Sequence, residues 1–90
     1  MGERIRRSLR IRFERASNRV QKLSSRPSKQ HLLDLYALYK QANSGDCIGR
    51  SRGILKERMK WKAWNSLVGT SEAEAMKKYC KIVDYLVSSD

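Results

Sequence analysis

Apolar residues recur at helical spacing in four stretches of this sequence, and no stretch alternates apolar and polar residues as a half-buried strand would. The four stretches cover about residues 10–23, 29–43, 56–67 and 71–87. A helix places residues three and four apart on one face, so each stretch would present an apolar stripe. The stripes of the first and last stretches are Phe13, Ala16, Val20 and Leu23, and Ala75, Met76, Tyr79, Cys80, Val83, Leu86 and Val87. We expect these two stripes to pack on each other in an all-α, four-helix domain.

Capping residues and one glycine-rich segment mark the predicted helix boundaries. The second helix follows a proline, which disfavours helix at the preceding residue, and Ser28 is a suitable N-cap for it. Ser71 and Glu74 match a capping box at the start of the fourth helix, and Gly69 is a suitable C-terminal cap for the third. Residues 43–53 contain three glycines and are predicted to form the one long loop.

Positive charge is concentrated at the N-terminus. The 90 residues carry 20 Lys and Arg against 9 Asp and Glu, a net charge of +11, which favours an anionic partner. We divide the chain into a basic N-terminal extension, residues 1–12, and a domain, residues 13–90. The arginines of the extension are Arg4, Arg6, Arg7, Arg10 and Arg12. Ile5, Leu9 and Phe13 are spaced four apart, so the extension is predicted to continue the first helix; the alternative is an organelle transit peptide.

Several functional classes are excluded by composition. Cys47 and Cys80 are too few for a disulfide framework and have no CxxC spacing, which favours reduced thiols and a cytoplasmic location. His31 is the one histidine, so no metal site or cofactor is expected. No triad, phosphate loop or paired buried acids are indicated, and we expect a protein that is not an enzyme. No apolar run reaches the ~20 residues that span a bilayer.

The segment "LYALYKQA", residues 35–42, contains the first candidate binding residues. Residues 29–43 are predicted to place one apolar face inward, with Leu33 and Leu38 flanking it: Leu32, Leu35, Tyr36 and Tyr39. Tyr36, Tyr39 and Lys40 also share spacings of i, i+3 and i+4, so they point in one direction. Half-buried packing is one interpretation of this arrangement. The other is a site for a flat anion, because phenol hydroxyls and an ammonium donate to phosphate and a ring stacks on a base.

The segment "KWKAW", residues 60–64, contains a second set of candidates. Trp61 and Trp64 lie three residues apart and Lys60 precedes them. Trp64 would be a core anchor and Trp61 would be partly exposed, whereas a functional interpretation gives Lys60 a phosphate contact. With so few aromatic residues available, one nucleotide pocket with an extra phosphate is favoured over an extended track for a single strand.

Two longer strings resemble the acyl-CoA-binding protein family, also called the diazepam-binding inhibitor family. They are "LYALYKQANSGD" and "KWKAWNSLVGTSEAEAMKKY", and the resemblance runs from about Phe13 to Leu86. It implies a four-helix up-down-down-up bundle that binds medium- to long-chain acyl-CoA esters without catalysis, and that buffers and transports them. It implies a lipid-binding protein of fatty-acid metabolism, and nothing in the sequence demands more than a monomer.

The resemblance also implies roles for individual residues. Tyr36, Lys40 and Lys60 match the family's contacts to the 3′-phosphate, and Tyr39 matches a ring at the adenine site. Tyr79 matches the tyrosine of the fourth helix in the head-group pocket. The remaining implied ligand neighbours lie on the first helix: Ala16, Ser17, Gln21 and Lys22. Candidates for lining the acyl groove are Ile54, Leu55 and Met59.

The chain departs from the family pattern in two places. Relatives usually carry a lysine in the first helix where this chain has Gln21, with Lys22 beside it. The segment 46–58 is shorter by about two residues and lacks a Pro-Gly turn. These departures affect one head-group contact and the acyl groove.

Two other partners are compatible with the charge. The alternative function is a small basic nucleic-acid-binding helical domain, with steep salt dependence; the family resemblance argues against nucleic acid. Acidic membrane surfaces are a further candidate partner of the Arg-rich N-terminus, and this would be compatible with ligand binding.

Overall fold

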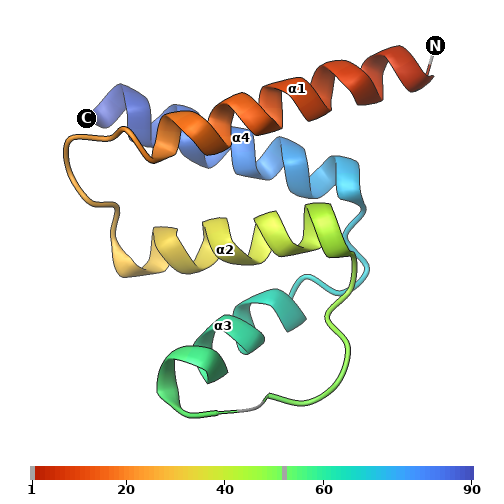
Figure 1. Ribbon diagram of the computed structural model, residues 1–90, viewed down its shortest axis with the longest axis vertical. Coiled ribbons are helices and arrows are strands. Elements are labelled where there is room, and N and C mark those ends of the chain that lie inside the picture. The colour runs from red at the N-terminus through yellow and green to blue at the C-terminus, as the bar shows by residue number, and fades with distance from the viewer. Residues whose placement is uncertain (1, 52) are drawn as a thin grey trace.

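The computed structural model describes residues 2–51 and 53–90, and the side chains from Arg6 onward within the first helix. It contains four helices: α1 (Gly2–Val20), α2 (Lys29–Ser44), α3 (Leu55–Asn65) and α4 (Glu72–Ser89). In Figure 1, α1 and α4 run in one direction and α2 and α3 run in the opposite direction. The predicted all-α, up-down-down-up bundle is therefore confirmed.

The helices are arranged nearly in one layer. The molecule measures 39 × 34 × 14 Å along its principal axes. Helix α4 packs on both α1 and α2, and α3 packs on α2. Within the described residues, no close backbone contact joins α1 to α2 or α3 to α4. Helix α2 therefore packs on α3 and α4 but has no close backbone contact with α1, and the candidate site forms along α2.

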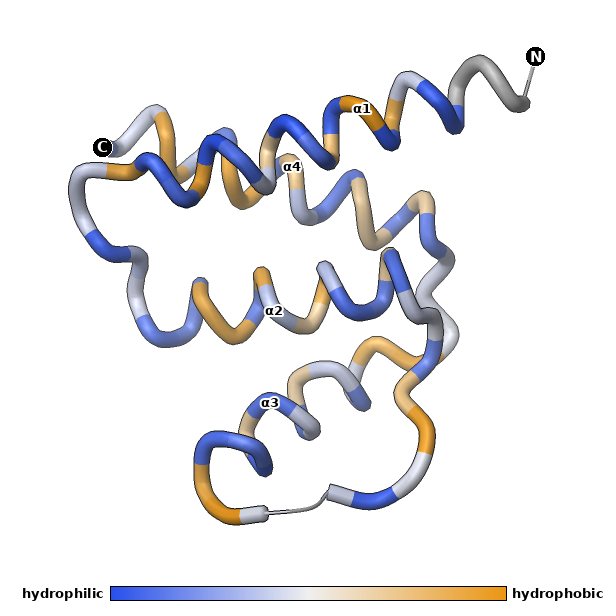
Figure 2. The backbone as a smooth tube through the Cα atoms, viewed as in Figure 1, coloured by the Kyte–Doolittle hydropathy of each residue, from blue (hydrophilic) through white to orange (hydrophobic). Residues whose placement is uncertain are grey.

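The core lies where α1, α2 and α4 meet, and Figure 2 shows the hydrophobic positions of these helices. The largest completely enclosed apolar side chains are Phe13 from α1 and Val83 from α4, each with an exposed fraction of 1% or less. The cluster of buried residues also contains Leu9, Ala16, Leu35, Leu38, Ala42, Ala75, Met76, Tyr79 and Cys80. The predicted packing between the stripes of the first and fourth helices is confirmed.

Two caps were predicted correctly from the sequence. The Ser28 hydroxyl accepts the His31 backbone N–H at 3.1 Å, and the Ser71 hydroxyl accepts the Glu74 N–H at 3.1 Å. Each bond satisfies a backbone donor that has no partner within its own helix. The predicted cap at Gly69 was wrong, because α3 ends earlier, with Ser66 as its C-cap. Gly69 instead ends the following turn with a φ of 91°, a conformation that glycine adopts without a steric penalty.

The C-terminal end of the first helix differs from its predicted position. It includes residues 2–12 and ends at Val20, so Leu23 lies beyond it but remains half-buried. The predicted inward face of the second helix also needs correction. Its core residues are Leu35, Leu38 and Ala42, whereas Tyr39 is 44% exposed. Because α2 contacts α4 on one side and α3 on another, its buried stripe is rotated away from the tyrosines.

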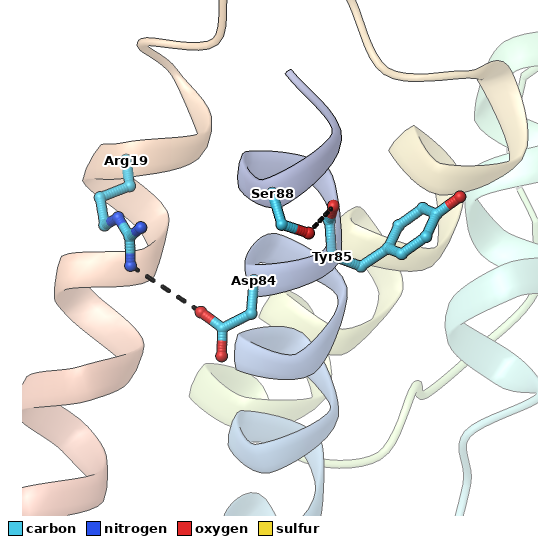
Figure 3. A network of polar contacts seen from close by, with 4 residues as sticks. All are labelled: Arg19, Asp84, Tyr85 and Ser88. Carbon is cyan, nitrogen blue, oxygen red and sulfur yellow. Dashed lines mark hydrogen bonds and ion pairs between the residues drawn. The ribbon is translucent and has the colours of Figure 1, made fainter.

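Polar contacts fasten α1 and α4 at their exposed edges. Arg19 Nη1 of α1 lies 3.8 Å from Asp84 Oδ1 of α4, and Figure 3 shows the two side chains pointing toward each other. The carboxylate of Asp90 accepts from the backbone N–H groups of Ser24 and Ser25 at 3.0 and 3.1 Å. The latter contacts hold the loop after α1 against the end of α4.

A second set of contacts fixes α3 relative to α2. Gln41, which is 1% exposed, donates through Nε2 to Asp46 Oδ1 at 2.7 Å and to the Thr70 carbonyl at 2.8 Å. The Gly69 N–H donates to the same Asp46 oxygen at 2.9 Å, and these bonds lower the pKa of Asp46 below its ordinary value. The segments before and after α3 are thereby joined to the end of α2.

Candidate functional site

Three of the predicted residues, Tyr36, Lys40 and Lys60, make contacts between α2 and α3. Lys60 Nζ of α3 lies 5.2 Å from the ring centroid of Tyr36 on α2. Lys40 Nζ lies 5.0 Å from the ring of Trp64, whose indole N–H donates to the Gly45 carbonyl at 2.9 Å. Two ammonium groups from different helices are thus held over aromatic faces, which is a favourable electrostatic arrangement. The structure brings Lys60 to Tyr36, and it places Lys40 on Trp64.

A groove lies between α2 and α3 beside these residues. We call it the α2–α3 groove; its volume is about 460 Å³ and it is lined by Arg26, Lys29, Leu32, Leu33, Lys56, Met59 and Lys60. Four of these side chains are cationic and three are apolar. A groove lined by both apolar and cationic side chains suits an amphipathic anion, whose apolar part loses contact with water while its anionic part meets positive charge.

Sequence reasoning identified only part of this groove. Met59 and Lys60 were predicted, and the other lining residues were missed. Helical spacing contained the signal, because Leu32 lies four residues before Tyr36 and Lys56 lies four residues before Lys60. Ile54 and Leu55, predicted as groove candidates, do not line it and are 80% and 78% exposed.

A second depression lies between α1 and α2. We call it the α1–α2 hollow; its volume is about 330 Å³ and it is lined by Arg10, Phe13, Glu14, Ser17, Asn18, Tyr39 and Asn43. The rings of Phe13 and Tyr39 have centroids 5.5 Å apart and bridge the two helices. The hollow therefore has an aromatic wall and polar groups on α1.

Tyr79 lies in the core, next to the rings of Phe13 and Tyr39. Its ring centroid is 4.9 Å from that of Phe13 and 6.2 Å from that of Tyr39, and it is 4% exposed. Burial raises the pKa of the Tyr79 phenol above its usual value of 10.0, and the Ser17 hydroxyl beside it acts in the opposite direction. The phenol is therefore neutral near pH 7 and acts as a hydrogen-bonding group there.

Of the other four predicted ligand neighbours, one lines the α1–α2 hollow and three do not. Ser17 lines the α1–α2 hollow, whereas Ala16 is buried in the core. Gln21 and Lys22 follow the end of α1, are exposed and line neither the groove nor the hollow.

The described residues show little that is suited to covalent chemistry or metal binding. No group of three or more potential metal ligands occurs among them. Burial raises the pKa of the Cys80 thiol, although the nearby positive charge of Arg12 opposes this, so the thiol is protonated and a poor nucleophile. Within residues 2–51 and 53–90, no helix has the length and apolarity needed to cross a membrane.

The chain is similar in sequence to known proteins of one family. The family model described as "Acyl CoA binding protein" matches residues 10–83. The acyl-CoA-binding protein of Saccharomyces cerevisiae is 45% identical over 78 residues, which cover 84% of this chain and 90% of that protein. The acyl-CoA-binding protein of Dictyostelium discoideum is 40% identical over 78 residues, covering 84% of this chain and 93% of that protein.

Solved structures agree in fold as well as in sequence. The crystal structure of Oryza sativa acyl-CoA-binding protein 2 superimposes with a TM-score of 0.85 at 37% identity, covering 91% of each chain. The solution structure of the yeast protein gives a TM-score of 0.69 at 44% identity, covering 86% of this chain and 92% of that one. On this combined sequence and structural similarity, the chain belongs to the acyl-CoA-binding protein family.

Proposed function

We propose that this protein binds medium- to long-chain acyl-CoA esters reversibly and without catalysis. The observation that carries the proposal is the α2–α3 groove, which is lined by four cationic and three apolar side chains and includes Lys60, the partner of Tyr36. This combination matches a ligand with a phosphorylated head group and an apolar chain. The family relationship supports the same ligand, because the relatives are named for it.

The head group would bind along α2. In this proposal Tyr36, Lys40 and Lys60 contact the 3′-phosphate, and Tyr39 supplies a ring for the adenine. Hydrogen bonds from cations to phosphate are stronger than neutral ones, so these residues would select coenzyme A esters over fatty acids that lack coenzyme A. Tyr79 would pack against Tyr39 from the core, consistent with the 6.2 Å between their ring centroids.

The acyl chain would dominate affinity differences among esters. Each buried methylene contributes about 0.8 kcal/mol, so eight additional carbons add at most about 6 kcal/mol. Ordering a flexible chain and leaving part of it exposed both reduce that gain. Leu32, Leu33 and Met59 are the apolar side chains of the groove that would meet this part of the ligand.

In the cell, such a protein would act as a cytoplasmic, monomeric buffer and carrier. The N-terminal extension would add contact with acidic membrane surfaces, because Arg6, Arg7 and Arg12 are exposed on α1. Each basic residue near an anionic bilayer contributes about 1 kcal/mol to attraction. Removing residues 1–10 and measuring attachment to vesicles with and without acidic lipid tests this role; unchanged attachment would refute it.

The ligand itself is tested by calorimetric titration with palmitoyl-CoA, with coenzyme A and palmitate as separate controls. We expect one-to-one binding of the ester that is far tighter than binding of either half. Absence of binding by the ester, together with tight and salt-sensitive binding of oligonucleotides, would refute the proposal in favour of a nucleic-acid-binding domain.

A further inference from the structure

Asn43 of α2 binds the Arg10 side chain of α1 at the edge of the α1–α2 hollow. Its Nδ2 donates to the Tyr39 backbone carbonyl at 2.9 Å, and its Oδ1 accepts from Arg10 Nη1 at 2.8 Å. Each end of the amide therefore has a partner, and the orientation of Asn43 is determined by both. The contact fixes Arg10 against α2, although no close backbone contact joins the described parts of α1 and α2. Ordering the arginine before a ligand arrives reduces the entropy lost on binding.

The Arg10 guanidinium retains the capacity to bind an anion. Its Cζ lies 5.7 Å from the ring centroid of Phe13, so the group is supported by an aromatic face. A guanidinium has five N–H donors, and the bond to Asn43 uses one of them. In the described part of the chain, the one ion pair joins Arg19 to Asp84, and no described carboxylate pairs with Arg10.

The hollow combines two kinds of recognition chemistry. Tyr39 is 44% exposed and offers an aromatic surface on α2, while Arg10 is the cation among the lining residues. Ser17 and Asn18 add a hydroxyl and an amide from α1. A ligand that joins a flat ring to a phosphate matches both parts, because a ring packs on tyrosine and a phosphate accepts two parallel bonds from a guanidinium.

We propose that Arg10 binds a phosphate oxygen of the nucleotide head group, so that the α1–α2 hollow forms part of the acyl-CoA site. This inference rests on the proposed function and deepens it by adding a cation from the N-terminal extension. Arg10 acts as a ligand contact, and Asn43 acts as the residue that positions it. The extension thereby contributes to ligand affinity, independently of any contact with membranes.

The test compares Arg10→Ala with Arg15→Ala. Arg15 is exposed on the same helix, its loss changes the charge equally, and it does not line the hollow. Dissociation constants for coenzyme A and palmitoyl-CoA are measured by calorimetry at low and physiological salt. We expect Arg10→Ala to weaken both ligands about five- to tenfold, as for one charge-assisted contact partly screened by water. Arg15→Ala should weaken them by less than about twofold, because a distant exposed charge is screened.

The Glu14→Gln substitution is expected to change ligand affinity in the opposite direction. Glu14 lines the same hollow, so removing its negative charge should strengthen both ligands, a result that loss of folding cannot produce. Asn43→Ala keeps the charge of Arg10 but releases its position, so it should weaken binding by less than Arg10→Ala. Circular dichroism before each titration confirms that the variants are folded.

The outcomes separate this inference from the proposed function. If palmitoyl-CoA binds tightly and Arg10→Ala matches Arg15→Ala, the role of Arg10 is wrong and acyl-CoA binding stands. If the unsubstituted protein fails to bind palmitoyl-CoA at all, the proposed function fails, and the inference fails with it.

Discussion

Replacing Lys60 with alanine tests the centre of the proposed site. The ammonium lies 5.2 Å from the Tyr36 ring and borders the α2–α3 groove. Loss of an exposed cation–π contact costs about 0.5–1 kcal/mol of stability, which is small against the 5–15 kcal/mol typical of a domain. The variant is therefore expected to fold, and a change in ligand affinity would report on the site.

The expected loss of affinity follows from the type of contact and its exposure. A hydrogen bond to a charged group contributes about 1.5–3 kcal/mol, and solvent screening of the exposed Lys60 lowers this to about 1–2 kcal/mol. Since each 1.4 kcal/mol is a factor of ten, palmitoyl-CoA should bind about 5- to 30-fold more weakly. Isothermal titration calorimetry measures this directly.

Lys62→Ala is the matched control for this experiment. Lys62 lies on the same helix, is exposed and does not line the groove, so its substitution removes the same charge without the proposed contact. Equal effects of the two substitutions, within about twofold, would show that only long-range charge matters and would remove Lys60 from the site.

Three further predictions concern the head group and the fold. Lys40→Ala should weaken octanoyl-CoA and palmitoyl-CoA by a similar factor in parallel titrations, because the head group is common to both; an effect confined to one ester would contradict this. Phe13→Ala should destabilise the protein by about 3–5 kcal/mol in urea unfolding followed by tryptophan fluorescence, since the ring is 1% exposed and packs on Tyr79 at 4.9 Å; a loss below about 1 kcal/mol would be inconsistent with this core. Asp90→Ala should lower stability at neutral pH, and the difference should disappear in acid. Hydrogen bonds from the loop after α1 lower the pKa of Asp90 from 3.8 to about 2, so their stabilisation is complete above pH 3.8 and is lost as the pH falls toward 2. Unfolding curves across this range check the sign, and a difference that grows in acid would refute it.

The aromatic residues illustrate how far sequence reasoning reached within the candidate site. The spacing of Tyr36, Tyr39 and Lys40 depends only on helix geometry, so their proximity on α2 was predictable. In the structure Tyr36 and Lys40 contact residues of α3, whereas Tyr39 packs on Phe13 of α1. That Lys40 rests on Trp64 depends on how α3 packs beside α2, which no spacing within one helix can supply. The roles assigned to these residues remain predictions until binding is measured.

The N-terminal extension also has one feature that the sequence indicated and one contact that it did not. Its helical continuation was indicated by apolar residues four apart, and α1 includes residues 2–12. The hydrogen bond from Arg10 to Asn43 joins residues 33 positions apart, so it becomes visible only when the two helices are placed together.

The sequence by itself determined the helical class, the two N-caps and the packing of the first stripe on the fourth, because these depend on local hydrogen bonds and on apolar periodicity. Only the tertiary structure decided which side chains surround the groove and the hollow. It exposed Ile54 and Leu55 and brought Lys60 to Tyr36. The physical reason is that the rotation and separation of each helix are set by packing of the whole core, and a small rotation changes which residues face a shared space.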